Sequence, residues 1–138
     1  MLIGRFAIDP AGLELEGDVV GLLDLSHALT CDRQTRAIQL STIQPPPYDR
    51  CLTAILITKI SDDAACLNIS RIASEMHITG PGRKLAVLAK NIKFLISQTV
   101  EPTSTIQEHI HIEWYQDHPL LSPTSIPLTI DFRTSDAP

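Results

Sequence analysis

The stretch LELEGDVVGLLDLSHAL (residues 13–29) and the stretch MHITGPGRKLAVLAKNI (residues 76–92) can be laid over each other at a constant offset of 63. Three identities fall at this offset, one glycine and two leucines: Gly17 with Gly80, Leu22 with Leu85, and Leu25 with Leu88. Each stretch passes from the alternating hydrophobicity of a strand to the periodicity of an amphipathic helix. The pair therefore predicts that a unit of strand, glycine turn and helix occurs twice.

Both helical segments carry an apolar stripe. Residues 83–97 place leucine, isoleucine and alanine on one side and lysines on the other. The first segment, residues 19–29, is shorter and follows Asp18, which we expect to be its N-cap. Two helices with one stripe each cannot enclose a core, so we expect both to pack on one face of a sheet.

Eight segments have the alternation of strands, two before and two after each helix. They are residues 3–8, 12–16, 36–42, 52–60, 66–71, 75–79, 109–115 and 126–132. This order predicts an α+β fold of two β-β-α-β-β units, an internal duplication with both helices on one face of a largely antiparallel sheet. Residues 1–133 then form a single domain, with a pseudo-repeat of residues 1–63 and 64–133, and residues 134–138 form a flexible tail.

The last predicted strand contains Pro127 on its polar face. Proline cannot donate to a strand ladder, which indicates an edge position. An exposed edge favours pairing with another chain. We therefore expect a homodimer formed through this edge.

Composition excludes several classes of protein. Of the 138 residues, 43% are hydrophobic, enough to close one core. The net charge of −5 argues against nucleic acid as a partner, because phosphate binding needs a basic surface. The longest apolar run, TAILI, is far shorter than a membrane span. Three cysteines with no C-x-x-C pair suit a reducing compartment. We expect a small, soluble, cytoplasmic protein with no membrane partner.

The segment HIHIEWY (residues 109–115) is the main candidate site. Alternation places its isoleucines and Trp114 on the buried face and His109, His111 and Glu113 on the other. A His-x-His pair on a strand can chelate a transition metal, and His77, on the polar face of its own strand, is the candidate that completes a zinc site with Glu113. One alternative is a solvated sheet face without a cofactor. The other is a pH-sensitive or partner-facing patch, formed by Glu108, His109, His111, Glu113, Asp117 and His118.

A partner-binding patch would consist of His109, His111, Glu113 and Tyr115. Tyrosine is a common anchor in protein interfaces. No serine or cysteine lies in a recognisable activating context. The pattern therefore favours binding over catalysis.

The turn GPGRKL (residues 80–85) is a candidate anion site. Gly80 and Gly82 would leave backbone N–H groups accessible, and Arg83 and Lys84 add positive charge at a helix N-terminus. The turn lacks the pattern of a nucleotide-binding P-loop. The alternative is a solvated basic turn.

The segments MHITGPGRKLAVLAKNIKFL, HIHIEW and LLSPTSIPLTI, within residues 76–130, resemble small bacterial immunity proteins of polymorphic toxin systems. The family pattern has a second glycine before the helix leucine, where this half has Lys84 and the first half has Gly21. The resemblance implies a protein that binds and neutralises a partner protein, a toxin, without catalysis.

Three hypotheses follow. The first is a non-enzymatic protein-binding module, an immunity-like neutraliser. The alternative is a metal-binding protein or small metalloenzyme that uses zinc on His77, His109, His111 and Glu113. The third is a structural homo-oligomer with no small ligand.

Overall fold

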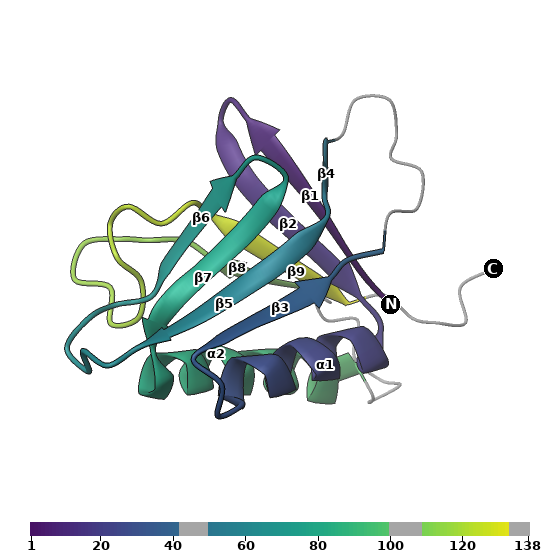
Figure 1. Cartoon of the computed structure of the whole chain (residues 1–138). Coiled ribbons are helices and arrows are strands. Elements are labelled where there is room, and N and C mark those ends of the chain that lie inside the picture. Colours follow the sequence, from purple (N-terminus) through teal and green to yellow (C-terminus); the bar gives the residue numbers. More distant parts are fainter. Residues whose placement is uncertain (42–49, 100–108, 133–138) are drawn as a thin grey trace.

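A computed structural model describes residues 1–41, 50–99 and 109–132 of the chain (Figure 1). The predicted tail, residues 134–138, lies outside the described residues. The elements in chain order are β1 (Leu2–Ile8), β2 (Ala11–Gly17), α1 (Val19–Thr30), β3 (Thr35–Gln39), β4 (Arg50–Leu52), β5 (Ala54–Ile60), β6 (Asn68–Ile72), β7 (Glu75–Pro81), α2 (Gly82–Thr99), β8 (His109–Ile112) and β9 (Leu128–Phe132). The α+β class and the two helices are as predicted.

The described strands form two sheets, so the expectation of a single sheet is wrong. Sheet A has the order β4-β1-β2-β9-β8, and sheet B has the order β3-β5-β7-β6. Neighbouring strands are antiparallel except for β2 with β9 and β5 with β7, which are parallel. Alternation in a sequence shows which side of a strand is buried, but it does not show which strand lies beside it.

Each sheet combines strands from both halves of the chain. In sheet A, the hairpin of β1 and β2 is joined to β9 and β8. In sheet B, the hairpin of β6 and β7 is joined to β5 and β3. The parallel contacts are therefore the places where the first and second halves of the chain meet in a sheet.

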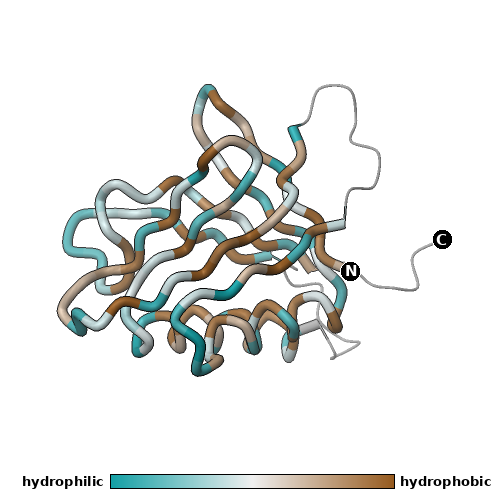
Figure 2. Tube along the Cα trace, in the orientation of Figure 1, coloured by the Kyte–Doolittle hydropathy of each residue, from teal (hydrophilic) through white to brown (hydrophobic). Residues whose placement is uncertain are grey.

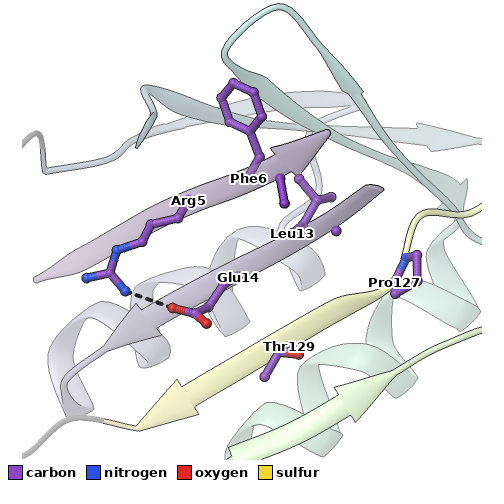
Figure 3. Close-up of a pocket in the computed structure, with 8 residues that line it drawn as sticks. Arg5, Phe6, Leu13, Glu14, Pro127 and Thr129 are labelled. Carbon is purple, nitrogen blue, oxygen red and sulfur yellow. Dashed lines mark hydrogen bonds and ion pairs between the residues drawn. The ribbon is translucent and has the colours of Figure 1, made fainter. Parts of the chain in front are cut away.

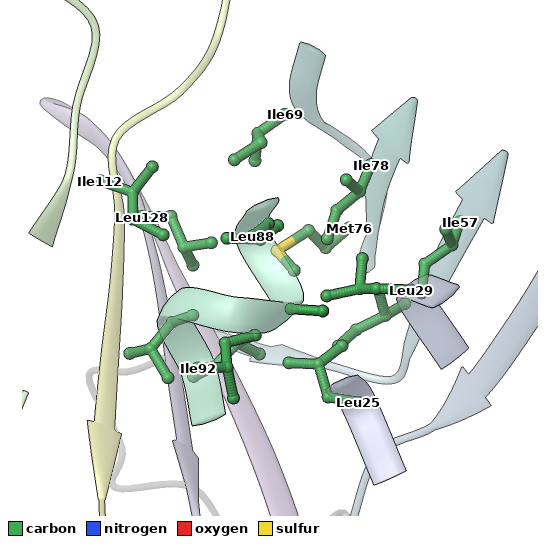
Figure 4. Packing of buried hydrophobic residues seen from close by; sticks show 14 of the residues in the cluster. Leu25, Leu29, Ile57, Ile69, Met76, Ile78, Leu88, Ile92, Ile112 and Leu128 are labelled. Carbon is green, nitrogen blue, oxygen red and sulfur yellow. The ribbon is translucent and has the colours of Figure 1, made fainter. Parts of the chain in front are cut away.

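The core lies between the sheets and the helices. In Figure 1 both helices lie below the two sheets, and Figure 2 shows hydrophobic and hydrophilic residues alternating along many of the strands. Figure 4 shows buried side chains from both helices and both sheets packing together: Leu25, Leu29, Ile57, Ile69, Met76, Ile78, Leu88, Ile92, Ile112 and Leu128. One continuous apolar cluster thus holds the elements together.

The two helices approach closely where small residues meet. Ser26 of α1 is fully buried, and its Oγ donates a hydrogen bond to the carbonyl oxygen of Ala89 in α2 at 3.2 Å. Burial of a hydroxyl is costly unless it is hydrogen-bonded, and this contact satisfies it. The small side chains allow the two backbones to lie near each other.

The N-cap prediction for α1 is confirmed. Oδ1 of Asp18 accepts a hydrogen bond from the backbone N–H of Gly21 at 2.8 Å. It also accepts one from the amino group of Met1 at 2.6 Å. The Met1 ammonium, followed by the Gly21 N–H, lowers the pKa of Asp18, because both stabilise the carboxylate.

The edge assignment for the last strand is wrong. β9 lies between β2 and β8, and the carbonyl oxygen of Pro127 accepts a hydrogen bond from Leu13 N–H at 2.9 Å. Pro127 precedes the strand, where its missing N–H breaks no ladder bond. Among the described strands, β4, β8, β3 and β6 are the ones at sheet edges.

Candidate functional site

The outward face of sheet A is polar because its strands alternate between core and solvent residues. In β2, Leu13 and Leu15 point into the core, while Glu14 and Glu16 point outward. We call this surface the polar face; its residues are Arg5, Glu14, Glu16, His109, His111, Thr129 and Asp131. The strand register arranges them in two rows: Arg5, Glu14, Thr129 and His111 in one, and Glu16, Asp131 and His109 in the other.

Several residues of the polar face contact each other across strands. Nη1 of Arg5 lies 2.7 Å from Oε1 of Glu14, and its Nη2 lies 3.4 Å from Oε2 of Glu16. Nδ1 of His111 lies 3.1 Å from Oγ1 of Thr129. With three carboxylates and one guanidinium, the polar face is acidic.

A hollow of about 310 Å³ opens on the polar face (Figure 3). It forms where Gly12 has no side chain and where no other atom lies close to the position of a Cβ. Arg5, Glu14, Pro127 and Thr129 are among the residues that line it. The guanidinium and the carboxylate beside it are paired with each other.

Asp131 of the polar face has a shifted pKa. Burial, followed by the charge of Glu14, raises the pKa of Asp131, while His109 acts in the opposite direction. The carboxylate is therefore held in a setting that disfavours its charge.

We expect Asp131→Asn to stabilise the protein at pH 7. The folded protein binds the Asp131 proton more tightly than the unfolded chain, so the free energy of unfolding falls as pH rises from the ordinary pKa of 3.8 through the raised value. Asp131→Asn has no carboxylate at this position, so this fall in the free energy of unfolding does not occur in the variant. Urea unfolding at pH 7 and pH 4 gives the free energy of unfolding of both proteins. The difference in favour of Asp131→Asn should be largest at pH 7 and smaller at pH 4. An equal advantage at both values would contradict the prediction, and Asp24→Asn, an exposed helix position, is the charge-matched control.

The predicted binding residues lie partly on the polar face and partly beyond it. His109 and His111 lie in β8 with their rings 4.7 Å apart, edge to face. The strand ends at Ile112, so Glu113 and Tyr115 follow it as exposed residues rather than continuing it.

The expectation that Trp114 is buried is wrong. Trp114 is 38% exposed and Tyr115 is 58% exposed, because the chain leaves the sheet before it reaches them. The ring of Tyr115 lies 4.4 Å from the ring of His118. The rings of Trp114 and Tyr115 are thus accessible from solvent.

The predicted metal ligands are divided between the sheets. His77 lies in β7 of sheet B, opposite Leu56 and Ser70, and its Nε2 is 3.6 Å from Oε1 of Glu75. His109 and His111 lie in sheet A. Within the described part of the chain, no three His, Cys, Asp or Glu side chains are grouped so that they could hold a metal ion. Zinc binding stays a prediction, with a donor set that this fold does not bring together.

The predicted anion site is not a turn. Gly80 and Pro81 are the last residues of β7 and are buried, and α2 begins directly at Gly82. Arg83 donates a hydrogen bond to the carbonyl oxygen of Asp63 at 2.9 Å. Nζ of Lys84 lies 3.5 Å from Sγ of Cys66. These contacts join α2 to the chain segment before β6, and anion binding by these residues stays a prediction.

Five polar-face residues were not predicted: Arg5, Glu14, Glu16, Thr129 and Asp131. The signal for Glu14 and Glu16 was present, since the alternation in LELEG places both opposite the buried leucines. Glu14 and Glu16 lie near Asp131 because β2 pairs with β9 in parallel. The sequence pattern does not show which strands pair.

Comparisons with protein-family models, with curated proteins and with solved structures find no match to this chain. No helix within residues 1–41, 50–99 and 109–132 is long and apolar enough to cross a membrane.

Proposed function

We propose that this protein is a non-enzymatic protein-binding module. It binds its partner through the polar face of sheet A together with the exposed residues Glu113, Trp114 and Tyr115. The observation that carries the proposal is the exposure of two large aromatic side chains directly after an edge strand of an acidic face. Exposed aromatic residues beside complementary charge are typical of protein interfaces.

The chemistry of this surface favours a partner with a basic patch. Burial, followed by the charge of Glu14, disfavours the Asp131 carboxylate, and a lysine or arginine from a partner would place an opposite charge beside it. The aromatic side chains would supply apolar contact area beside the charged pairs. Charge complementarity of this kind raises the rate of association and selects the partner.

We propose that the partner is a toxin and that binding neutralises it. The support is the resemblance of residues 76–130 to immunity proteins and the acidic, aromatic character of the proposed surface. An immunity protein needs no reacting groups, because occupation of the toxin's surface is enough to block it. We also propose a cytoplasmic location, supported by Cys31, Cys51 and Cys66, which are all free thiols.

The test is a binding measurement with a partner captured from the natural source and identified by mass spectrometry. With both proteins purified, we expect the double variant Tyr115→Ala/Glu113→Lys to weaken the affinity by about 30-fold or more, as hot-spot truncation does. Phe94→Ala is the matched control, because Phe94 is an exposed aromatic residue on α2, away from the polar face. An affinity unchanged in the double variant would remove this surface from the proposal.

We propose that the chain arose by duplication of a β-β-α-β-β unit. The support is a matching pair of parallel strand contacts, β2 with β9 and β7 with β5. Leu13 of β2 lies opposite Leu128. Met76 of β7, which is 63 positions after Leu13, lies opposite Ile55. Ser26 and Ala89, which touch at the helix contact, are also 63 residues apart. Equivalent positions of two related units would meet in this way at a twofold axis.

We also propose a homodimer. Its contact cannot use the last strand, as the position of Pro127 had suggested, because that strand lies inside sheet A. The outer side of β6 contacts the 120–126 segment through hydrogen bonds that include Ile126 N–H to the carbonyl oxygen of Ile69 at 2.8 Å. Among the strands that the structure describes, β3, β4 and β8 are each paired on one side only, to β5, β1 and β9. Strand-to-strand association of two copies would use one of these edges.

A further inference from the structure

His118 joins the exposed aromatic residues to the folded body. Its Nδ1 lies 3.0 Å from the backbone nitrogen of Leu120 and 3.1 Å from that of Leu121, and it accepts a hydrogen bond from each. An imidazole nitrogen that accepts hydrogen bonds carries no proton, so the proton of this ring is on Nε2. The arrangement therefore requires a neutral His118.

The chain on both sides of His118 is held by contacts of the His118 ring and by backbone hydrogen bonds. On one side, the ring contacts Tyr115, and the His118 N–H donates to the carbonyl oxygen of Tyr115 at 3.0 Å. On the other side, Leu120 accepts a hydrogen bond from Leu67 N–H at 2.8 Å, and Leu121 forms a bridge with Leu67. The imidazole thus connects the position of Tyr115 to the chain segment before β6.

We propose that His118 is a pH-operated latch for residues 113–118, whose far side is anchored by the buried Leu120 and Leu121. Protonation places a hydrogen on Nδ1, which then faces two N–H donors instead of accepting from them. Both hydrogen bonds are lost, and the segment that carries Trp114 and Tyr115 is released from its fixed conformation. Histidine is the side chain suited to this role, since its charge ordinarily changes between pH 5 and 8.

The ionisable groups around the latch come from two elements. Tyr115 contacts the ring, and Asp117, which has a positive φ of 62°, precedes it on the same turn. From α2, Arg83 and Lys84 line a hollow of about 350 Å³ together with Leu120. Histidines elsewhere in the chain do not contact this segment through any described hydrogen bond, so variants can separate their titration from that of His118.

The test uses the fluorescence of Trp114, the only tryptophan of the chain, in the isolated protein between pH 8 and pH 5. We expect a shift of emission in the wild type, with the far-UV circular dichroism unchanged. In His118→Asn the amide oxygen takes the place of Nδ1 and does not titrate, so the shift should be lost. His118→Ala should show the low-pH emission at every pH, and His111→Asn should keep the wild-type shift.

Three results would overturn the latch: no shift in the wild type, a shift of wild-type size in His118→Asn, or a shift that coincides with loss of the circular dichroism signal. The latch would also make partner binding pH-dependent, and that consequence rests on the proposed function. Because the fluorescence is measured without a partner, failure of the binding surface and failure of the latch give different results.

Discussion

Leu25→Ala and Leu88→Ala should each lower the free energy of unfolding by about 2–5 kcal/mol. Both side chains are 1% exposed and lie in the core where the helices meet the sheets (Figure 4). Removing three carbon atoms from either leaves a cavity that well-packed neighbours cannot fill completely. Urea unfolding measures both losses, and a loss below about 1 kcal/mol in either variant would contradict this placement.

The comparison between these two variants also bears on the proposed duplication. Leu25 and Leu88 are 63 residues apart and occupy corresponding positions on α1 and α2. If the halves are equivalent, the losses in free energy of unfolding of the two variants should agree within about 1 kcal/mol. The same substitution costs less where neighbouring side chains move into the cavity, so equal losses indicate similar surroundings. Val87→Ala is the control, because Val87 is 44% exposed and its truncation should change stability by less than about 0.5 kcal/mol.

Gly80→Ala should cost about 3 kcal/mol, the upper end of the usual range for overpacking. A Cβ on Gly80 would overlap Cδ2 of Leu67 and lie 3.2 Å from its Cα. Leu67 is fully buried, so its side chain has no solvent-filled space into which to move, and the nearby backbone limits any relief. Gly80 does not have a positive φ, so the cost is steric and not conformational. Thermal and urea unfolding would both report it.

Gly12→Ala is the matched control for Gly80→Ala. Both glycines lie in strands, but no atom lies within 4 Å of a Cβ on Gly12. The added methyl group restricts the unfolded chain, so stability should stay the same or rise by about 0.4–1 kcal/mol. Equal losses in the two variants would show that glycine is needed in these strands for a reason other than the contact with Leu67.

Local structure could be predicted from the sequence because it depends on neighbouring residues. The α1 cap at Asp18 and the inward side of β8 follow from residue type and alternation, and Ile112 is buried as predicted. The strand-to-helix junction at Gly80 was predicted as a turn because glycine and proline usually indicate one. Here the glycine serves close packing against Leu67 instead.

Only part of the candidate site could be predicted from the sequence. His109 and His111 were assigned to a polar strand face, and the structure adds Asp131 opposite His109, Thr129 opposite His111, and Glu14 and Glu16 on the next strand. Those partners come from β2 and β9, which are neighbours only in the folded chain. Trp114 was misplaced because the alternation of residues 109–115 continues beyond the point where hydrogen bonding of β8 ends.

The exchange of strands between the two halves has a consequence for synthesis on the ribosome. The strands β5, β6 and β7 of sheet B lie within residues 54–81 and can pair early, whereas β2 cannot pair with β9 until the end of the chain has been made. Contacts between residues so distant in sequence form slowly. During that interval one side of β2 presents unpaired backbone groups next to the apolar side chains Leu13 and Leu15, a surface that other nascent chains or a chaperone can bind.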